Sequence, residues 1–171
     1  SNTHEMCFQG EVVGGFTIES DGALLLFMAR GAVCRWSNGE LTTIISEIPE
    51  ERESRFNDVL ADPMGRVFCG TMATPSRPGR LYRLDLDRKL TVMAEGILCS
   101  NGMAFSPGHR HMYYTDSYTR EISVFDYDAQ TGSLKNRRSF VKSDEKDGLP
   151  DGSTIDAEGY LWSAQWDGYC L

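Results

Sequence analysis

The sequence predicts an all-β fold made of repeated four-stranded sheets, and three observations support this prediction. Short apolar runs such as 23–27, 66–69 and 111–115 are bounded by Gly, Pro, Asn or Asp, which is typical of strands that end in tight turns. The chain has 17 glycines, many of them in Asp-Gly and Asn-Gly turn contexts. The third observation is that a polar residue, an apolar stretch and a glycine turn recur along the chain.

The repeat units begin near residues 15, 57, 101 and 151, at intervals of 42, 44 and 50 residues. Each unit opens with a small or polar residue followed by an apolar run, and a glycine turn leads from this run into a second one. A third and a fourth run follow in the first three units, at 32–36 and 41–45, at 80–85 and 90–93, and at 121–126 and 138–141. The one helix-like stretch, 46–52, is short and contains Pro49. Four strands in a period of roughly 40–50 residues describe one blade of a β-propeller.

The number of repeats predicts a partial propeller domain over residues 1–171, with about three to four blades. Residues 15–150 supply three blades, 151–171 supply the inner strands of a fourth, and 1–14 are interpreted as the outer strand of a preceding blade. Propellers close with four to eight blades, so we expect the first blade and the later blades to be absent from this chain. Open blades expose apolar faces, through which we expect association.

Composition and charge exclude several classes of protein. The formal net charge is −8 and no cluster of Lys and Arg occurs, which argues against nucleic-acid binding. The longest apolar stretch, 23–29, is too short to span a bilayer, and the first ten residues contain no apolar signal-peptide segment. The five cysteines include no Cys-x-x-Cys pair, which predicts reduced core thiols. We therefore expect a cytoplasmic protein with neither a nucleic-acid nor a membrane partner.

Three polar residues, Asn57, Asn101 and Asp151, occupy one repeat position at the start of successive first strands. The first strand of each propeller blade lines the central channel, so these side chains should converge at one mouth of the channel. Their oxygen atoms suit calcium, magnesium or manganese. The alternative is that they are turn or bulge residues whose side chains cap local backbone. Arg55, in the loop above this mouth, could bind a polyol or a carboxylate, or could pair with a neighbouring glutamate.

Other polar residues give weaker predictions. Asp58 and Asp62 are interpreted as turn acceptors, and Asp116 as a residue that holds backbone or a neighbouring blade. The sequence contains no Gly-x-Ser-x-Gly nucleophile elbow, no Gly-x-Gly-x-x-Gly loop and no phosphate-binding loop. A Ser-His-Asp triad therefore stays an open alternative that no nucleophile elbow supports, and no motif indicates nucleotide binding.

Four segments in their order and spacing resemble the regucalcin (senescence marker protein)/gluconolactonase family, whose members are sugar lactone lactonase-like. They are RFNDVLADPMGRVFCGTM at 55–72, SNGMAFS at 100–106, FDYD at 125–128 and PDGSTIDAEGYLW at 150–162. The likeness covers about 10–171. It implies a six-bladed propeller with one divalent metal in the central channel. Many members hydrolyse sugar lactones, and close relatives hydrolyse organophosphates.

The resemblance also implies roles for four residues of this chain. Asn101 and Asp151 correspond to metal ligands, and Asp151 corresponds to the proposed general base. Arg55 and Asn57 correspond to the substrate-binding pair, and Asn57 could reach the metal through water. Two features depart from the family. No residue matches the third ligand, a glutamate that precedes the region 7–10, and an acidic substrate contact expected after Met72 is replaced by Ala-Thr-Pro at 73–75.

These features predict a metal-dependent hydrolase that opens small sugar lactones. The cation (calcium, zinc, magnesium or manganese) would polarise the lactone carbonyl, and Asp151 would assist the attack of water. Two alternatives remain open: a non-catalytic, calcium-binding regulatory propeller, and an esterase or phosphotriesterase on the same metal site. We expect the 171-residue chain by itself to have little activity.

Overall fold

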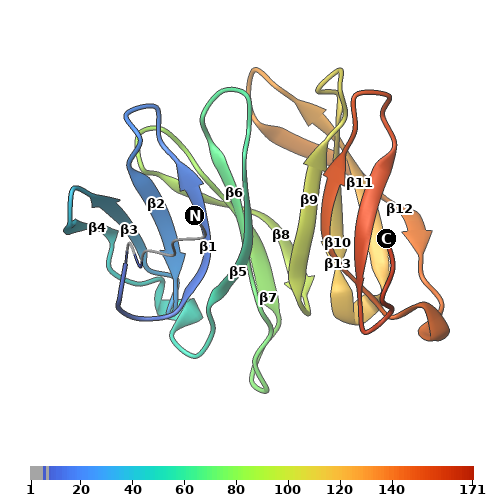
Figure 1. Cartoon of the computed structure of the whole chain (residues 1–171), viewed down its shortest axis with the longest axis horizontal. Coiled ribbons are helices and arrows are strands. Elements are labelled where there is room, and N and C mark those ends of the chain that lie inside the picture. Colours follow the sequence, from blue (N-terminus) through green and yellow to red (C-terminus); the bar gives the residue numbers. More distant parts are fainter. Residues whose placement is uncertain (1–5, 7) are drawn as a thin grey trace, which may run out of the picture.

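The architecture is all-β, as predicted. The computed structural model describes residue 6 and residues 8–171. These residues form three four-stranded antiparallel sheets and one two-stranded antiparallel sheet. The sheets stand side by side in chain order, from β1–β4 near the N-terminus to β13–β14 near the C-terminus (Figure 1).

Within each sheet, consecutive strands pair with one another. The first sheet contains β1 (Val13–Ile18), β2 (Leu24–Met28), β3 (Val33–Ser37) and β4 (Glu40–Ile45). The second contains β5 (Phe56–Ala61), β6 (Val67–Thr71), β7 (Gly79–Leu84) and β8 (Leu90–Ile97). The third contains β9 (Ser100–Phe105), β10 (His111–Asp116), β11 (Glu121–Asp128) and β12 (Ser133–Lys142). The fourth contains β13 (Leu149–Ile155) and β14 (Leu161–Trp166), and three short 3₁₀ helices connect strands: η1 (Pro49–Glu51), η2 (Ser117–Thr119) and η3 (Glu145–Asp147).

The segment before β1 differs from its prediction. Residues 8–12 form no strand, so their interpretation as the outer strand of a preceding blade is wrong; residues 1–5 and 7 lie outside the described residues. The carbonyl of Val12 accepts a hydrogen bond from the amide of Ala29 at 3.2 Å. The end of this segment therefore lies beside the end of β2 in space, and the chain passes from it directly into β1.

The first strands of the four sheets lie next to one another. β1 contacts β5, β5 contacts β9, and β9 contacts β13. Two glycines permit this close approach. A Cβ atom at Gly14 would overlap the carbonyl oxygen of Phe56, and one at Gly102 would overlap the carbonyl oxygen of Asp151. Only glycine lets the backbones come this close, and the starts of the four strands are thereby brought together.

Two apolar cores lie between successive sheets, and β6 contributes to both. All five residues of β6 are buried. Since side chains alternate along a strand, Val67 and Cys69 pack into the core shared with the first sheet, whereas Phe68 packs into the core shared with the third. Phe27 and Phe56 meet edge to face in the first core, with ring centroids 5.4 Å apart.

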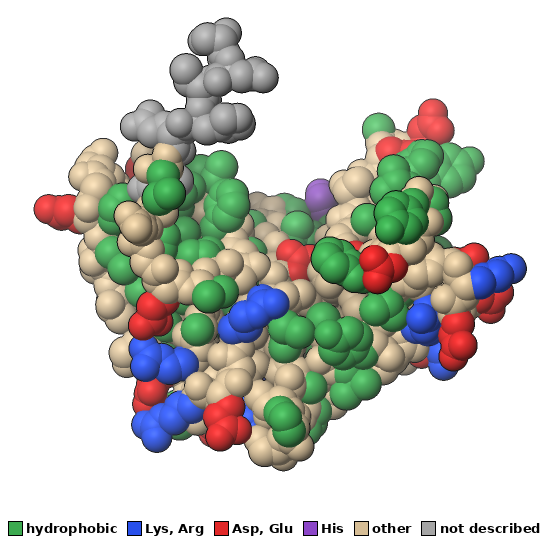
Figure 2. Space-filling model, turned by 60° about the horizontal axis from the view of Figure 1, so that its bottom comes forward, with side chains coloured by type: hydrophobic (Ala, Val, Ile, Leu, Met, Phe, Trp, Pro, Cys, Tyr) green, Lys and Arg blue, Asp and Glu red, His purple; other side chains and the backbone are tan. Residues whose placement is uncertain are grey.

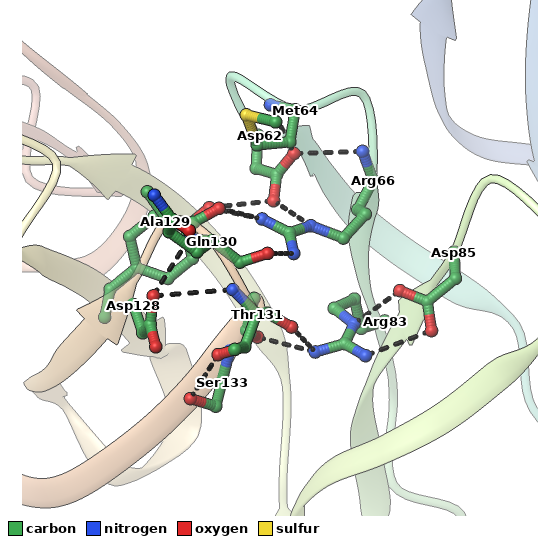
Figure 3. A network of polar contacts seen from close by, with 12 residues as sticks. Asp62, Met64, Arg66, Arg83, Asp85, Asp128, Ala129, Gln130, Thr131 and Ser133 are labelled. Atoms are coloured by element: carbon green, nitrogen blue, oxygen red, sulfur yellow. Dashed lines mark hydrogen bonds and ion pairs between the residues drawn. The ribbon is translucent and has the colours of Figure 1, made fainter.

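A polar network joins the second sheet to the turn between β11 and β12 (Figure 3). Arg66 forms an ion pair with Asp62 at 2.6 Å, and Tyr127 donates its hydroxyl hydrogen to the same carboxylate at 2.8 Å. Arg66 also donates to the carbonyls of the first two residues of the turn 129–132, at 2.5 and 3.1 Å. Arg83 donates to the carbonyls of the last two, at 3.0 and 2.8 Å. Two arginines of one sheet therefore bind four consecutive carbonyls of the next.

The cysteine prediction is confirmed for three residues and wrong for one. Cys34, Cys69 and Cys99 are buried free thiols. Cys170 is exposed, because it follows the last strand and packs under no further sheet within the described residues. Cys7 lies outside the described residues. None of the described helices has the length and apolar character needed to cross a membrane.

The two end sheets expose large apolar side chains. Phe16 and Ile18 are exposed on the first sheet, and Trp162 and Trp166 on the fourth. The prediction that such faces mediate association stays a prediction.

Candidate functional site

The four predicted site residues line one cavity of about 340 Å³, which we call the site cavity. Arg55 and Asn57 come from the start of β5, Asn101 from the start of β9, and Asp151 from the start of β13. Three different sheets thus bring together residues that are far apart in the sequence. Figure 2 turns this end of the sheets toward the reader, and acidic, basic and hydrophobic side chains lie side by side near the middle of the face.

Each first strand carries a β-bulge at its start. The pairing register shifts between Val13 and Gly15, between Phe56 and Asp58, between Asn101 and Met103, and between Pro150 and Ser153. A bulge places two residues opposite one and turns the extra side chain out of the regular alternation. Asn57 and Asp151 lie in these irregular stretches, and Asn101 lies directly before Gly102 in a third. The repeated bulge is the local reason that these side chains reach one cavity.

Arg55 is held by backbone contacts with both neighbouring segments. It forms an isolated bridge with Ala29, and its carbonyl accepts a hydrogen bond from the amide of Met72 at 3.2 Å. Its guanidinium donates to the carbonyl of Phe56 at 3.0 Å.

The glutamates that could have paired with Arg55 bind other groups. Glu51 is buried and contacts Tyr82 and Arg77, each at 2.6 Å, while Glu53 accepts a hydrogen bond from Ser76 at 3.0 Å. The Arg55 guanidinium therefore faces the site cavity without either of these two carboxylates as its partner.

The two asparagines use their amide nitrogens to hold neighbouring structure. Asn57 Nδ2 donates to the carbonyl of Ser100 at 2.8 Å, across the boundary between the second and third sheets. Asn101 Nδ2 donates to Ser117 Oγ at 3.1 Å. The capping alternative is therefore partly correct, since Asn57 does bind backbone, although this backbone belongs to another sheet. In both residues the amide oxygen is the atom that remains for a ligand.

Asp58 was predicted to accept hydrogen bonds in a turn, and this prediction is wrong. It lies inside β5, where its carboxylate accepts a hydrogen bond from the amide of Val59 at 2.8 Å. Burial raises the pKa of Asp58, and the charge of Asp151 raises it further. Asp62, in contrast, does cap a turn, because it accepts hydrogen bonds from the amides of Met64 and Arg66.

The interpretation of Asp116 as a backbone holder is confirmed. Its buried carboxylate accepts hydrogen bonds from the amides of Leu98 and Cys99, both at 2.9 Å. These contacts fix the chain immediately before β9 and hence the position of Asn101. Burial, with a further contribution from the Asp116 carboxylate, raises the pKa of the Cys99 thiol, which keeps this cavity-lining thiol protonated.

Sequence reasoning missed several residues that line the site cavity: Met72, Cys99, Ser117, Tyr118, Leu149 and Trp166. Most of them follow the last residue of a second strand or precede a first strand. For Ser117, Tyr118 and Trp166, the signal in the sequence was their position directly after the second strand or at its end.

The donor set around the site cavity fits a hard divalent cation in its chemistry. One carboxylate, from Asp151, and the two carboxamide oxygens of Asn57 and Asn101 are of the type that calcium, magnesium and manganese prefer. Among residue 6 and residues 8–171, no group of three or more His, Cys, Asp or Glu side chains could hold a metal. The position expected for the third family ligand, ahead of residues 7–10, lies outside the described residues.

The family model described as SMP-30/Gluconolactonase/LRE-like region matches residues 1–171. The chain belongs to this family. Pentonolactonase XacC of Haloferax volcanii is 42% identical over 171 residues, which is all of this chain and 58% of that protein. Regucalcin of Gallus gallus is 40% identical over 146 residues, which is 81% of this chain and 49% of that protein. The chain thus spans about half the length of these curated relatives.

Solved structures of the SMP-30/gluconolactonase/LRE-like family have the same fold. A luciferin-regenerating enzyme matches with a TM-score of 0.85 and 32% identity, over 95% of this chain and 58% of that one. A gluconolactonase from Xanthomonas campestris, XC5397, matches with a TM-score of 0.72 and 27% identity, over 93% and 60%. The Dos1 propeller matches at 14% identity with a TM-score of 0.64 over 90% of this chain, which supports the propeller fold alone. The family and the partial propeller predicted from the sequence are confirmed.

Proposed function

We propose that the intact protein hydrolyses a sugar lactone at the site cavity. The observation that carries this proposal is the convergence of Arg55, Asn57, Asn101 and Asp151 from three sheets around one cavity. Its volume of about 340 Å³ falls in the range typical of small-molecule sites. The names of the pentonolactonase and the gluconolactonase among the relatives support a lactone as the substrate class.

In the proposed reaction, Asp151 acts as the general base. Its carboxylate takes a proton from a water molecule while the water oxygen forms a bond to the lactone carbonyl carbon. The ring carbon–oxygen bond then breaks, and the ring oxygen takes up that proton and leaves as a hydroxyl group. The product is the open-chain aldonic acid. Arg55 and Asn57 donate and accept hydrogen bonds with the sugar hydroxyls, which orients the ring before the attack.

Asn101 and Asp151 are the residues that would hold a divalent cation in this proposal. When bound, the cation would supply polarisation of the lactone carbonyl. The oxygen donors favour calcium, magnesium or manganese, and zinc is a further candidate. Ser117 fixes the amide of Asn101 through its hydrogen bond at 3.1 Å, so the Asn101 oxygen is already oriented.

The test is Asp151→Asn in the intact protein, with hydrolysis of gluconolactone and a pentonolactone followed by a pH indicator. Loss of a general base is expected to lower kcat/KM by about 10²- to 10⁴-fold. Glu158→Gln, an exposed carboxylate in the turn after β13, is the matched control and should leave the rate unchanged. Undiminished turnover by a folded Asp151→Asn variant would reject the assignment.

Titration calorimetry with calcium, zinc, magnesium and manganese separates this proposal from its alternatives. Cation binding without turnover of any aldonolactone would favour a non-catalytic calcium-binding propeller. Hydrolysis of aryl esters or phosphotriesters that exceeds hydrolysis of lactones would favour an esterase on the same site.

A further inference from the structure

Two aromatic side chains stand at the rim of the site cavity. Tyr118 belongs to η2, directly after β10 of the third sheet, and Trp166 is the last residue of β14 in the fourth. Both line the site cavity together with Asn101 and Asp151, and Tyr118, which lies on an inner sheet, is 58% exposed. Large rings exposed beside convergent polar groups are typical of a binding site rather than of a core.

The backbone under each ring is fixed. In η2, the amide of Ser117 donates to the carbonyl of Cys99 at 3.1 Å, and Thr119 Oγ1 donates to the carbonyl of Asp116 at 3.0 Å. Trp166 pairs with Leu149 in the ladder between β13 and β14, and Leu149 is two residues before Asp151 in β13. The rings are thus carried on ordered backbone next to the candidate ligands, and a bound molecule would find them already in place.

The chemistry of a sugar lactone matches this arrangement. Its hydroxyl groups point outward around the edge of the ring, whereas a face of the ring presents C–H bonds. The negative face of an aromatic ring attracts such C–H groups, and stacking removes apolar surface of both partners from water. Arg55 and Asn57 meanwhile offer polar atoms to the hydroxyl edge.

We propose that Tyr118 and Trp166 form an aromatic subsite that stacks on the C–H face of the sugar lactone ring. This inference rests on the proposed function and deepens it, because it assigns substrate selection to the rim of the site cavity. The subsite favours cyclic sugars with an uninterrupted C–H face over acyclic polyols and over compact polar esters. Stacking acts on the ring and not on the reacting carbonyl, so it stabilises the bound substrate and the transition state equally.

Equal stabilisation makes a distinct kinetic prediction. Tyr118→Ala and Trp166→Ala in the intact protein should each raise KM for gluconolactone by about three- to tenfold and leave kcat unchanged. Tyr118→Phe and Trp166→Phe keep an aromatic face and should largely restore KM. Tyr160→Ala is the matched control, since Tyr160 is 65% exposed at the opposite turn of the same two-stranded sheet.

A second measurement does not depend on turnover. Gluconolactam, in which nitrogen replaces the ring oxygen, is titrated while tryptophan fluorescence is recorded. We expect a saturable change in wild type that is absent in Trp166→Phe, where Trp36 and Trp162 remain, and a three- to tenfold weaker lactam affinity in Tyr118→Ala.

The outcomes separate the two proposals. Lactam binding that depends on Trp166 in a protein without lactonase activity would support the subsite while the proposed function fails. Lactonase activity with unchanged KM and unchanged lactam affinity in both alanine variants would overturn the subsite while the proposed function stands. Alanine variants that lower kcat alone, or a rise in KM that Tyr160→Ala reproduces, would also overturn it.

Discussion

Replacing Arg66 with leucine removes the guanidinium that joins the second and third sheets. The Asp62 side chain is 0% exposed and that of Arg66 is 9% exposed, so the substitution leaves a buried carboxylate without its charged partner. Breaking a buried ion pair in this way costs about 3–5 kcal/mol. Asp62 keeps the hydrogen bond from Tyr127 at 2.8 Å, which stabilises the remaining charge and places our expectation near the lower end of that range.

The matched control is Arg138→Leu. Arg138 pairs with Asp126 at 2.8 Å, but these side chains are 47% and 44% exposed, and exposed pairs contribute about 0–1 kcal/mol. Urea unfolding followed by circular dichroism at pH 7 measures the free energy of unfolding of both variants, and thermal unfolding measures their Tm. For a chain of this size each kcal/mol shifts Tm by roughly 2–4 °C, so we expect Arg66→Leu to lower Tm by about 6–12 °C.

Equal losses of stability in Arg66→Leu and Arg138→Leu would refute the argument from burial. A double-mutant cycle sharpens the test, because Asp62→Asn removes the charge that Arg66→Leu leaves unpaired. The double variant should therefore lose less stability than the two single variants together. Additive losses would mean that the two side chains do not interact.

Two further predictions concern the support of the site, and a third concerns the hydrogen bond between Tyr127 and Asp62 in the polar network. Gly102→Ala places a methyl group against the carbonyl oxygen of Asp151. This overlap should lower the free energy of unfolding, measured by urea titration, by about 1–3 kcal/mol. An unchanged free energy of unfolding would show that β9 and β13 can separate freely. Asp116→Asn turns an amide NH₂ group toward one of the two backbone amides whose hydrogen bonds the carboxylate accepts, which should lower the free energy of unfolding by about 1–3 kcal/mol. Hydrogen exchange at the amides of Leu98 and Cys99 should become faster. Unchanged exchange would contradict the anchoring role of Asp116. Burial and the Asp62 carboxylate raise the pKa of Tyr127 to about 12, above about 10 in the unfolded chain, so its contribution is complete below pH 10 and is lost as the pH rises through 12. Tyr127→Phe should therefore lose less stability than wild type between pH 10 and 12, and parallel pH profiles would count against this assignment.

The sequence predicted the strands well because each blade repeats the same order of apolar runs and turns. The first strands begin at Val13, Phe56, Ser100 and Leu149, within two residues of the predicted repeat starts. The convergence of Asn57, Asn101 and Asp151 followed from their common repeat position, and that of Arg55 from its place two residues before Asn57. Their chemical roles stay predictions.

Other features could not be predicted from the local pattern. The bulges at Asn57 and Gly102 depend on which residue of a neighbouring strand supplies each hydrogen bond, and no single segment contains that information. Asp58 was assigned to a turn because Asp is common in turns, but the bulge keeps it inside β5. Tyr118 and Trp166 gave no repeat signal, because one lies just after the second strand of its sheet and the other is the last residue of that strand.

The hydrogen bond from Asn57 to the carbonyl of Ser100 gives one small side chain two separate duties. Its nitrogen fastens adjacent blades, while its oxygen is left for whatever enters the cavity. Aspartate would retain the oxygen and forfeit the fastening, and alanine would forfeit both. Position 57 is thus constrained by architecture as well as by chemistry, so divergence toward new substrates should alter the rim and spare this amide.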